Sequence, residues 1–303
     1  MLIVKYRKLF FALTGAIVLI SLGSLIFFGL HPGTDFTGGT LAEIRYSAER
    51  PDPNALTISL NSAGLKGYSL REASSNAYIL RAGSLSNEIR GNLANIFSLN
   101  GKYPATVDRL TEVGPTIGLE LRNKALVALG LVLLCILLFI AFAFRKVSKP
   151  VSSWIYGLIA LVTLIHDVIV PVGFYAALGY FLGAQVDTLF VTAVLTVLGF
   201  SIHDTIVVFD RVRENPRVND VRNRREDFAE TAGRSLNQTF VRSINTSLTV
   251  LVTLLVLFFI GPESTRDFAL TLLVGIIAGT YSSIFLATPL LVSYERYAAK
   301  KKR

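Results

Sequence analysis

Long apolar runs alternate with polar segments along the chain, and one polar segment is far longer than the others. The runs cover residues 9–30, 126–144, 154–173, 188–209, 246–260 and 268–294. At 1.5 Å per residue, the first run would extend roughly 33 Å as a helix, which is enough to cross the apolar core of a bilayer. The fifth run is short, and it extends back through 240–243 if Arg242 is tolerated near the interface. The pattern therefore predicts six transmembrane helices.

The first apolar run also lies where a cleaved signal peptide would lie. A signal peptide has a shorter apolar stretch that ends at a cleavage site of small residues. Here the run is long, and His31, Pro32 and Gly33 follow it. We therefore expect residues 1–30 to form a short N-terminal segment and an uncleaved first transmembrane helix.

The long polar segment, residues 34–122, has the periodicity of a small α+β domain. Alternating apolar and polar positions predict strands at 40–47, 67–73, 76–82 and 105–113, with a turn at 74–75. Helical spacing predicts helices at 54–63 and 85–99, the second capped by Ser84 with Glu88 as its capping partner. The order β-α-β-β-α-β is that of a ferredoxin-like unit. We expect this domain at 31–123, in contact with other polypeptides, and the remaining five helices and a tail at 124–303.

Composition and charge also indicate a membrane protein. Hydrophobic residues make up 52% of the chain and charged residues 17%, against about 25% charged in a typical soluble domain. Of the 30 basic residues, 19 fall in the N-terminus, 145–149, 211–242 and 296–303, which the helix order places on one side of the membrane. Lys and Arg accumulate on the cytoplasmic side, so we expect both termini there and residues 31–123 outside. Topology and contact with anionic lipid explain the basic excess better than nucleic-acid binding does.

Several ionisable residues lie inside the spans or at their ends, among them Asp167, Asp204, Arg242 and Asp267. A charged side chain at the centre of a span costs about 2.5–3.5 kcal/mol by insertion assays. Counted from the span ends, Asp267 lies at the outer mouth, Asp167 near the middle, and Asp204 level with Arg242 toward the inside. One interpretation is structural: Asp204 pairs with Arg242, and Asp167 bonds to nearby hydroxyls. The other is a path for protons, the usual role of acids inside spans.

Histidines adjoin two of these acids in the sequence. His166 precedes Asp167, and His203 precedes Asp204. Neighbouring residues on a helix point about 100° apart, so neither histidine needs to touch its aspartate. We interpret each as a polar packing group in preference to a relay, and two isolated histidines do not predict a metal site.

Two further patterns accompany the spans. Gly275, Gly279 and Ser283 recur at every fourth position in the last one, which lets another helix approach closely. The approaching helix could belong to this chain or to a partner. Asp210 and Arg211 follow the fourth run and are interpreted as an interfacial stop and topology anchor.

Several segments carry a resemblance to a known family. Residues 199–215, GFSIHDTIVVFDRVREN, resemble the signature of the SecF family of bacterial protein-export membrane proteins. Asp35, Gly38 and Gly39 in DFTGG resemble the family's entry to its external domain, and the segments 166–168, 236–243 and 279–283 are similar to its later helices. The match covers nearly the whole chain in the right order. His203 is a departure, because the family pattern has asparagine there.

The resemblance implies an α-helical polytopic fold that is half of a twelve-helix transporter of the RND superfamily. This half would have six transmembrane helices and one extracytoplasmic ferredoxin-like domain between the first two. SecD would supply the other half as a heterodimer. The pair would use the proton gradient to promote late, ATP-independent stages of preprotein translocation across the bacterial inner membrane.

The resemblance also implies partners and site residues. The expected partners are the Sec channel (SecYEG), a membrane insertase and unfolded exported polypeptide, with no cofactor, no metal and no enzymatic activity. Asp204 and Arg242 would take part in proton movement, together with Asp267 and Asp167. The coupling ion stays open, since a carboxylate can serve sodium as well as protons.

Other functions fit parts of the sequence. An RND-like exporter of lipid or small molecules shares the fold but normally carries both halves in one chain. A non-transporting assembly factor of the translocase would show no dependence on the gradient. An intramembrane aspartyl protease needs two acids that share a proton, and the depths of Asp167 and Asp204 do not clearly match. The chain has no Walker A motif, which disfavours an ATPase. Its single cysteine, Cys135, excludes an intrachain disulfide.

Overall fold

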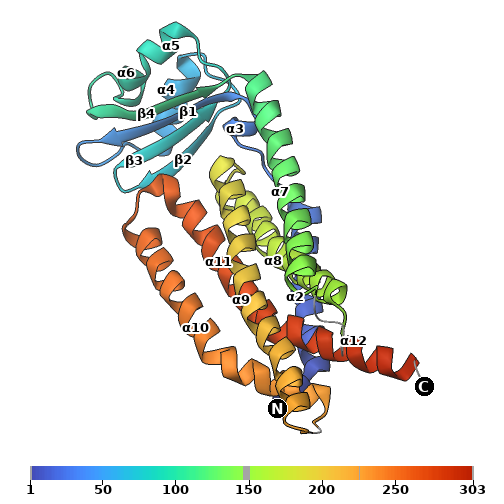
Figure 1. Cartoon of the computed structure of the whole chain (residues 1–303). Helices are drawn as coiled ribbons and strands as arrows, with labels where there is room; N and C mark the ends of the chain where they lie inside the picture. The colour runs from blue at the N-terminus through green and yellow to red at the C-terminus, as the bar shows by residue number, and fades with distance from the viewer. Residues whose placement is uncertain (1, 146–150, 225, 302–303) are drawn as a thin grey trace.

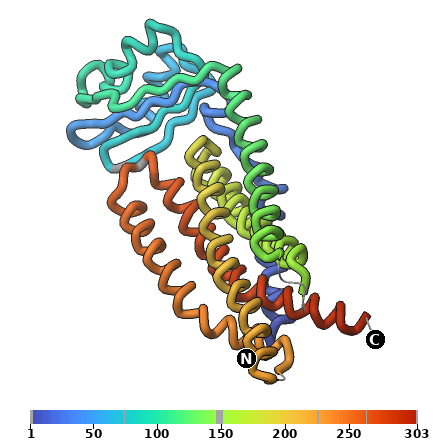
Figure 2. The backbone as a smooth tube through the Cα atoms, in the orientation of Figure 1, coloured from blue at the N-terminus to red at the C-terminus, as the bar shows by residue number. Residues whose placement is uncertain are grey.

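The chain forms a bundle of long helices with a small α/β domain on one end of it (Figure 1). The computed structural model describes residues 2–145, 151–224 and 226–301. Six helices in these ranges are long and apolar enough to cross a membrane, which confirms the predicted number. They are α2 (Arg7–Phe28), α7 (Pro115–Ala143), α8 (Ser153–Leu182), α9 (Thr188–Val221), α10 (Phe228–Ile260) and the bent pair α11–α12 (Arg266–Lys301), and the short helices α1 (Leu2–Lys5) and α3 (Thr34–Thr37) flank α2. Both chain ends lie at the end of the bundle away from the α/β domain (Figure 2).

The α/β domain is a four-stranded antiparallel sheet with short helices on one face (Figure 1). Its strands are β1 (Gly39–Tyr46), β2 (Ser69–Ser74), β3 (Ala77–Ala82) and β4 (Ala105–Val113), in the spatial order β2-β3-β1-β4. Its helices are α4 (Pro53–Ser62), α5 (Asn87–Gly91) and α6 (Leu93–Phe97). All neighbouring strands are antiparallel, so the predicted ferredoxin-like fold is confirmed.

Strand alternation gives this sheet two different faces. Ala42, Ile44 and Tyr46 point to one side of β1 and are buried under α4 and α6. The opposite face carries a smaller apolar cluster of Leu41, Ala73, Ala77 and Ile79. The sheet therefore has its main core on the helical side, and β2 lies at the edge next to the start of α11 (Figure 1).

Two details of the α/β domain differ from the prediction. The single helix expected after β3 is divided into α5 and α6, because the backbone at Asn92 leaves helical geometry between them. Its N-cap is Ser86, whose hydroxyl accepts a hydrogen bond from the Ile89 N–H at 3.3 Å. Ser84 instead donates to Glu112 at 3.2 Å. The β2–β3 turn also comes one residue later than expected.

The membrane helices extend beyond the apolar runs. α7 begins at Pro115, directly after β4, so the α/β domain joins the bundle with almost no linker. α9 continues to Val221 and α10 begins at Phe228, which turns the loop expected at 211–242 into a helical hairpin. Hydropathy indicates where a helix leaves the membrane and not where it ends, since charged residues also form helices in water. Of the basic residues used for orientation, Lys146, Lys149, Arg225, Lys302 and Arg303 lie outside the described ranges.

The last span bends where α11 (Arg266–Ser282) passes into α12 (Thr288–Lys301). The two are joined by η2 (Ser283–Ala287), a π-helical turn. Figure 1 shows α12 leaving the direction of the bundle and running across its base. The apolar run 268–294 therefore does not form one straight helix. Single π-helical turns often occur at functional sites, and this one directly follows a buried polar cluster.

Candidate functional site

Asp204 lies on α9 and faces the interior of the bundle, where 3% of its surface is exposed. Its carboxylate accepts a hydrogen bond from the Ser247 hydroxyl on α10 at 3.3 Å. Ser247 in turn accepts one from the Thr280 hydroxyl on α11 at 2.7 Å. Two hydroxyls thus connect the buried acid to two neighbouring helices.

The predicted ion pair between Asp204 and Arg242 is absent from the described part of the chain. Arg242 lies on an exposed face of α10, whereas Ser243 and Ser247 lie on its buried face. Each residue turns a helix by about 100°, so equal depth does not bring two side chains together. Neither His203 nor Arg242 forms a hydrogen bond or an ion pair with Asp204 among the described residues.

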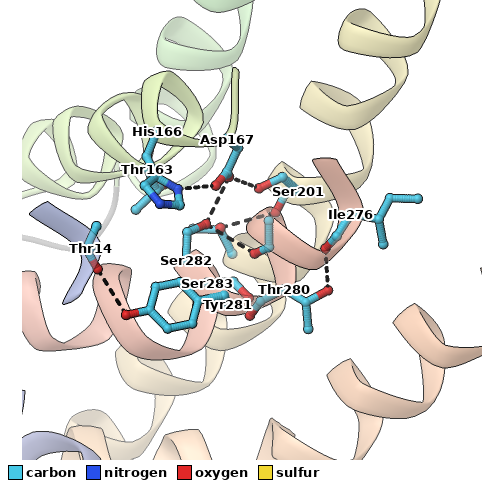
Figure 3. A network of polar contacts seen from close by, with 12 residues as sticks. Thr14, Thr163, His166, Asp167, Ser201, Ile276, Thr280, Tyr281, Ser282 and Ser283 are labelled. Atoms are coloured by element: carbon cyan, nitrogen blue, oxygen red, sulfur yellow. Dashed lines mark hydrogen bonds and ion pairs between the residues drawn. The ribbon is translucent and has the colours of Figure 1, made fainter. Parts of the chain in front are cut away.

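Asp167 lies on α8, completely buried in a second polar cluster (Figure 3). Its carboxylate accepts hydrogen bonds from the hydroxyls of Ser201 on α9 and Ser282 on α11, the latter at 2.9 Å. The Nδ1 atom of His166 lies 2.8 Å from the same carboxylate, a contact that helical geometry alone did not require. The other ring nitrogen, Nε2, is buried and has no hydrogen-bond partner among the described residues. The hydroxyl bonds match the structural interpretation of Asp167, and the histidine contact was missed.

The two acid clusters are neighbours along the same helices. Ser201 precedes Asp204 by three residues on α9, a rise of about 4.5 Å. Thr280 and Ser282 lie two residues apart on α11, a rise of about 3 Å. The two carboxylates bind different hydroxyls, since Asp167 accepts from Ser201 and Ser282 and Asp204 accepts from Ser247.

Small residues on α11 allow this close packing, and the helix they face is α9 of the same chain. A Cβ added to Gly275 would lie 2.3 Å from Val197 Cγ2. A Cβ added to Gly279 would lie 2.9 Å from the Cβ of Ser201. Gly279 therefore makes room for the hydroxyl that reaches the acid on α8. Ser283 is buried at the start of η2 and donates to the backbone of α11.

Asp267 lies in the first turn of α11 and binds the α/β domain. Its two carboxylate oxygens accept hydrogen bonds from the guanidinium of Arg71 on β2, at 2.6 and 3.2 Å. The side chain of Arg71 is 26% exposed and that of Asp267 is 22% exposed. Bidentate pairing fixes orientation as well as distance. The outer-mouth acid is thus a direct link between a membrane helix and the sheet.

A cavity of about 30 Å³ lies beside this ion pair, between the sheet and the start of α9. Arg81 of β3 and Asp187 line it together with Arg71 and Asp267. Burial lowers the pKa of the Arg81 guanidinium and raises the pKa of the Asp187 carboxyl. Asp187 also caps α9 by accepting a hydrogen bond from the Phe190 N–H at 2.8 Å. The junction between domain and bundle is therefore built from four charged side chains.

The DFTGG segment forms a tight corner that ties α3 and β1 to α9. Asp35 accepts hydrogen bonds from the N–H of Thr188 at 3.0 Å and from its hydroxyl at 2.6 Å. Gly38 and Gly39 have φ values of 79° and 134°, a region that favours glycine. A Cβ added to Gly39 would lie 2.4 Å from a carbonyl oxygen of β3. Both glycines are required by backbone geometry at the entry to the sheet.

Asp210 and Arg211 lie on the exposed surface of α9, beyond the apolar run. Asp210 pairs along the helix with Arg213 at 2.7 Å, and Arg211 pairs with Glu214 at 2.8 Å. Exposed pairs of this kind contribute little to stability. Neither residue takes part in the buried clusters.

The sequence interpretation missed the partners of the acids. Hydroxyl residues inside apolar runs can bond across helices, and four of them here are Ser201, Ser247, Thr280 and Ser282. That pattern could have identified them. Arg71 carried no such signal, because it lies 196 residues from Asp267 in an ordinary polar strand.

The chain matches two protein families. The family described as "Protein export membrane protein SecD/SecF, C-terminal" matches residues 95–297. The family described as "SecD/SecF GG Motif" matches residues 23–49, which include Gly38 and Gly39.

Relatives with translocase names match nearly the whole chain. "Protein translocase subunit SecF" of Thermobaculum terrenum is 43% identical over 97% of this chain and 93% of the relative. The subunit of the same name from Anaerolinea thermophila is 38% identical over 95% of this chain and 92% of the relative. "Protein translocase subunit SecDF" of Thermus thermophilus is 36% identical over 88% of this chain and 35% of the relative.

Solved structures match as well. "Crystal structure of SecDF, a translocon-associated membrane protein", from Thermus thermophilus, matches 97% of this chain with a TM-score of 0.83 and 33% identity. "Crystal structure of SecDF in Super-membrane-facing form" matches 96% with a TM-score of 0.66 and 34% identity. This chain spans 38% of each of those longer chains.

Proposed function

Because this chain belongs to the SecD/SecF family of protein-export membrane proteins, we propose that it is the SecF-type subunit of a protein-export machine in a bacterial inner membrane. The relatives named as translocase subunits support a role in export, and six apolar helices make the chain a multi-pass membrane protein. Its proposed task is to use the proton gradient during late, ATP-independent stages of translocation. Both termini are cytoplasmic in this proposal, and the α/β domain is extracytoplasmic.

The proposed partner is a SecD-type subunit. In the SecDF relatives, the part that this chain matches is fused to a longer remainder, which supports association of separate chains that correspond to those parts. The partner would complete a twelve-helix RND-type transporter. The Sec channel and an emerging, unfolded polypeptide are the further partners of the complete machine.

The observation that carries the proton-driven mechanism is the hydroxyl network of Asp204. An ionised carboxylate accepts a hydrogen bond from Ser247, as seen here. A protonated carboxyl can also donate, so taking up a proton allows the Asp204–Ser247–Thr280 chain of bonds to reverse. Because the three residues belong to α9, α10 and α11, a change in the network shifts the packing of three helices.

α11 connects this network to the α/β domain. Thr280 and Asp267 lie about 20 Å apart along the helix, and Asp267 holds Arg71 of the sheet at 2.6 Å. A shift of α11 would therefore change how the domain is held, and with it the domain's grip on polypeptide. Asp167 and Arg242 are also proposed to take part in proton transfer, Asp167 as the second buried acid and Arg242 as an exposed cation on α10.

Export into membrane vesicles tests the proposal. The quantity measured is gradient-stimulated completion of preprotein translocation after the ATP-driven step has been stopped. We expect Asp204→Asn to abolish this component, because an amide cannot take up and release a proton. Asp210→Asn makes the same change on the exposed surface of the same helix and serves as the matched control, which should keep full stimulation.

Two controls separate the alternatives. Co-purification with the SecD-type subunit from native membranes checks that Asp204→Asn still assembles. Replacing sodium by choline distinguishes a proton from a sodium requirement. Stimulation that survives in Asp204→Asn would contradict its role as carrier, and export by the unsubstituted protein that ignores the gradient would instead indicate an assembly factor.

A further inference from the structure

A cavity of about 700 Å³ opens at the end of the bundle that carries both chain termini. It lies where α1, the start of α2, the start of α10 and α12 come together. We call it the basic cavity, because five cationic side chains line it: Lys5, Arg7, Lys8, Arg234 and Arg296. The export mechanism proposed above does not use it.

Two of these cations are already neutralised within the protein. Arg234 donates a hydrogen bond to Glu226 at 2.5 Å, and Arg296 lies 3.6 Å from Asp227. The hydrogen bond from Arg234 also helps to hold the pKa of Glu226 at about 2, so this carboxylate stays ionised at neutral pH. The two acids are therefore committed to internal pairs.

The remaining three cations have no acidic partner in the described part of the chain. Lys5, Arg7 and Lys8 take part in none of the ion pairs found there. Glu230 is the single lining acid without a basic partner in those ranges. The cavity therefore keeps two positive charges in excess, so a ligand with one or two negative charges would balance it.

The cavity wall continues into an apolar surface on α2. Leu9 and Leu13 follow the cations along the helix, and 65% and 48% of their surfaces are exposed. Tyr6 is 50% exposed beside them, a residue type that collects at the level of lipid headgroups. In a bilayer these side chains would contact acyl chains. A ligand with both negative charge and acyl chains matches the whole surface, whereas a free phosphate or an acidic peptide would match only the charged part.

We propose that the basic cavity binds the headgroup of an anionic phospholipid, with the acyl chains lying along α2. Basic pockets between membrane helices suit such headgroups. A bound phosphodiester would pair with the uncompensated cations of α1 and α2, beside the already paired cations of α10 and α12. Lipid composition would then affect how firmly the base of the bundle is held together, independently of the proton path.

Lipid binding to the full chain tests this proposal. Purified protein in zwitterionic detergent is titrated with phosphatidylglycerol, and retained lipid is counted by native mass spectrometry. The triple variant Lys5→Gln, Arg7→Gln, Lys8→Gln should bind on the order of 100-fold more weakly, since each basic residue near anionic lipid contributes roughly fivefold.

The matched control is the triple variant Arg222→Gln, Lys300→Gln, Lys301→Gln. It removes the same charge at the same end of the molecule from exposed positions outside the cavity, and it should bind the lipid as the unsubstituted chain does. Glu230→Gln removes the unpaired acid and should tighten binding roughly fivefold. The Glu230→Gln variant keeps the test informative if the Lys5, Arg7, Lys8 triple variant inserts poorly into the membrane.

Four outcomes would overturn the proposal. Equal weakening in both triple variants would mean a diffuse surface charge effect. Equal binding of phosphatidylcholine would mean that acyl packing alone is responsible. Complete displacement by inorganic phosphate would indicate a site for small anions. Unchanged lipid binding with loss of a co-purifying subunit would assign the cavity to a protein partner.

Discussion

The ion pair between Arg71 and Asp267 should hold the α/β domain against the membrane helices. Arg71→Gln and Asp267→Asn each remove one charge from it, the second with almost no change of shape. We expect each substitution to loosen the contact of β2 with the start of α11. The double substitution should loosen it no further, because either single change already breaks the pair.

The expected size follows from the burial of this pair. Exposed ion pairs contribute about 0–1 kcal/mol, and hydrogen bonds to charged groups contribute about 1.5–3 kcal/mol. The pair lies between these cases, with side chains 26% and 22% exposed and contacts at 2.6 and 3.2 Å. Allowing for solvent screening, we expect about 2 kcal/mol, which is roughly a 30-fold change in the equilibrium between docked and undocked domain.

Hydrogen exchange on the full chain measures this equilibrium. Amides in β2 and in the first turns of α11 should exchange roughly 30-fold faster in each single variant and equally fast in the double variant. Arg45→Gln is the control, because it breaks an exposed pair with Asp108 in the same sheet, away from the junction. Additive effects of the two substitutions, or a change below about twofold, would refute the assignment of docking to this pair.

Close approaches and a charged hairpin give three further expectations. Gly39→Ala should destabilise the full chain by about 2–4 kcal/mol in thermal unfolding, from backbone strain plus overlap with β3. Gly64→Ala, at φ 82° with nothing within 4 Å of the added Cβ, should show the strain alone. Gly279→Ala should displace Ser201, cost about 1–3 kcal/mol and reduce gradient-stimulated export. Glu226→Gln should lower the melting temperature at pH 7. The pKa of Glu226 is depressed to about 2, so its contribution is complete above about pH 4.5 and is lost as pH falls toward 2. The difference from the unsubstituted chain should therefore shrink at pH 2.

The fold followed largely from local patterns. The strands of the α/β domain could be predicted because burial on one face imposes alternation, as in Ala42, Ile44 and Tyr46. The break at Asn92 could not, because the same helical spacing continues across it. The end of α9 and the start of α10 were also missed, because charged residues form these parts of the helices outside the membrane, where the apolar pattern stops.

Contacts between side chains in the candidate site depend on the direction in which each residue points from its helix more than on its depth in the membrane. Asp204 and Arg242 were placed at similar depth from residue counts, yet Ser243, one position after the arginine, is the residue that faces the interior. A count along a helix gives depth to within a turn, but an error of one residue rotates a side chain by about 100°. The contact of Asp267 with Arg71 was beyond sequence reasoning, because it depends on how the sheet lies on the bundle.

The last span, α11–α12, contributes residues to the contact with the sheet, to both acid clusters and to the basic cavity. α11 supplies Asp267 to the sheet and Thr280 and Ser282 to the two acid clusters, and α12 supplies Arg296 to the basic cavity. A continuous α-helix would carry a displacement to both ends alike. The π-helical turn at η2 interrupts it directly after Ser282. A change at the buried acids would thus be transmitted along the straight part of the helix to the sheet, while the bend separates α12 from that motion. The geometry therefore favours coupling of the acids to the α/β domain over coupling to the base of the bundle.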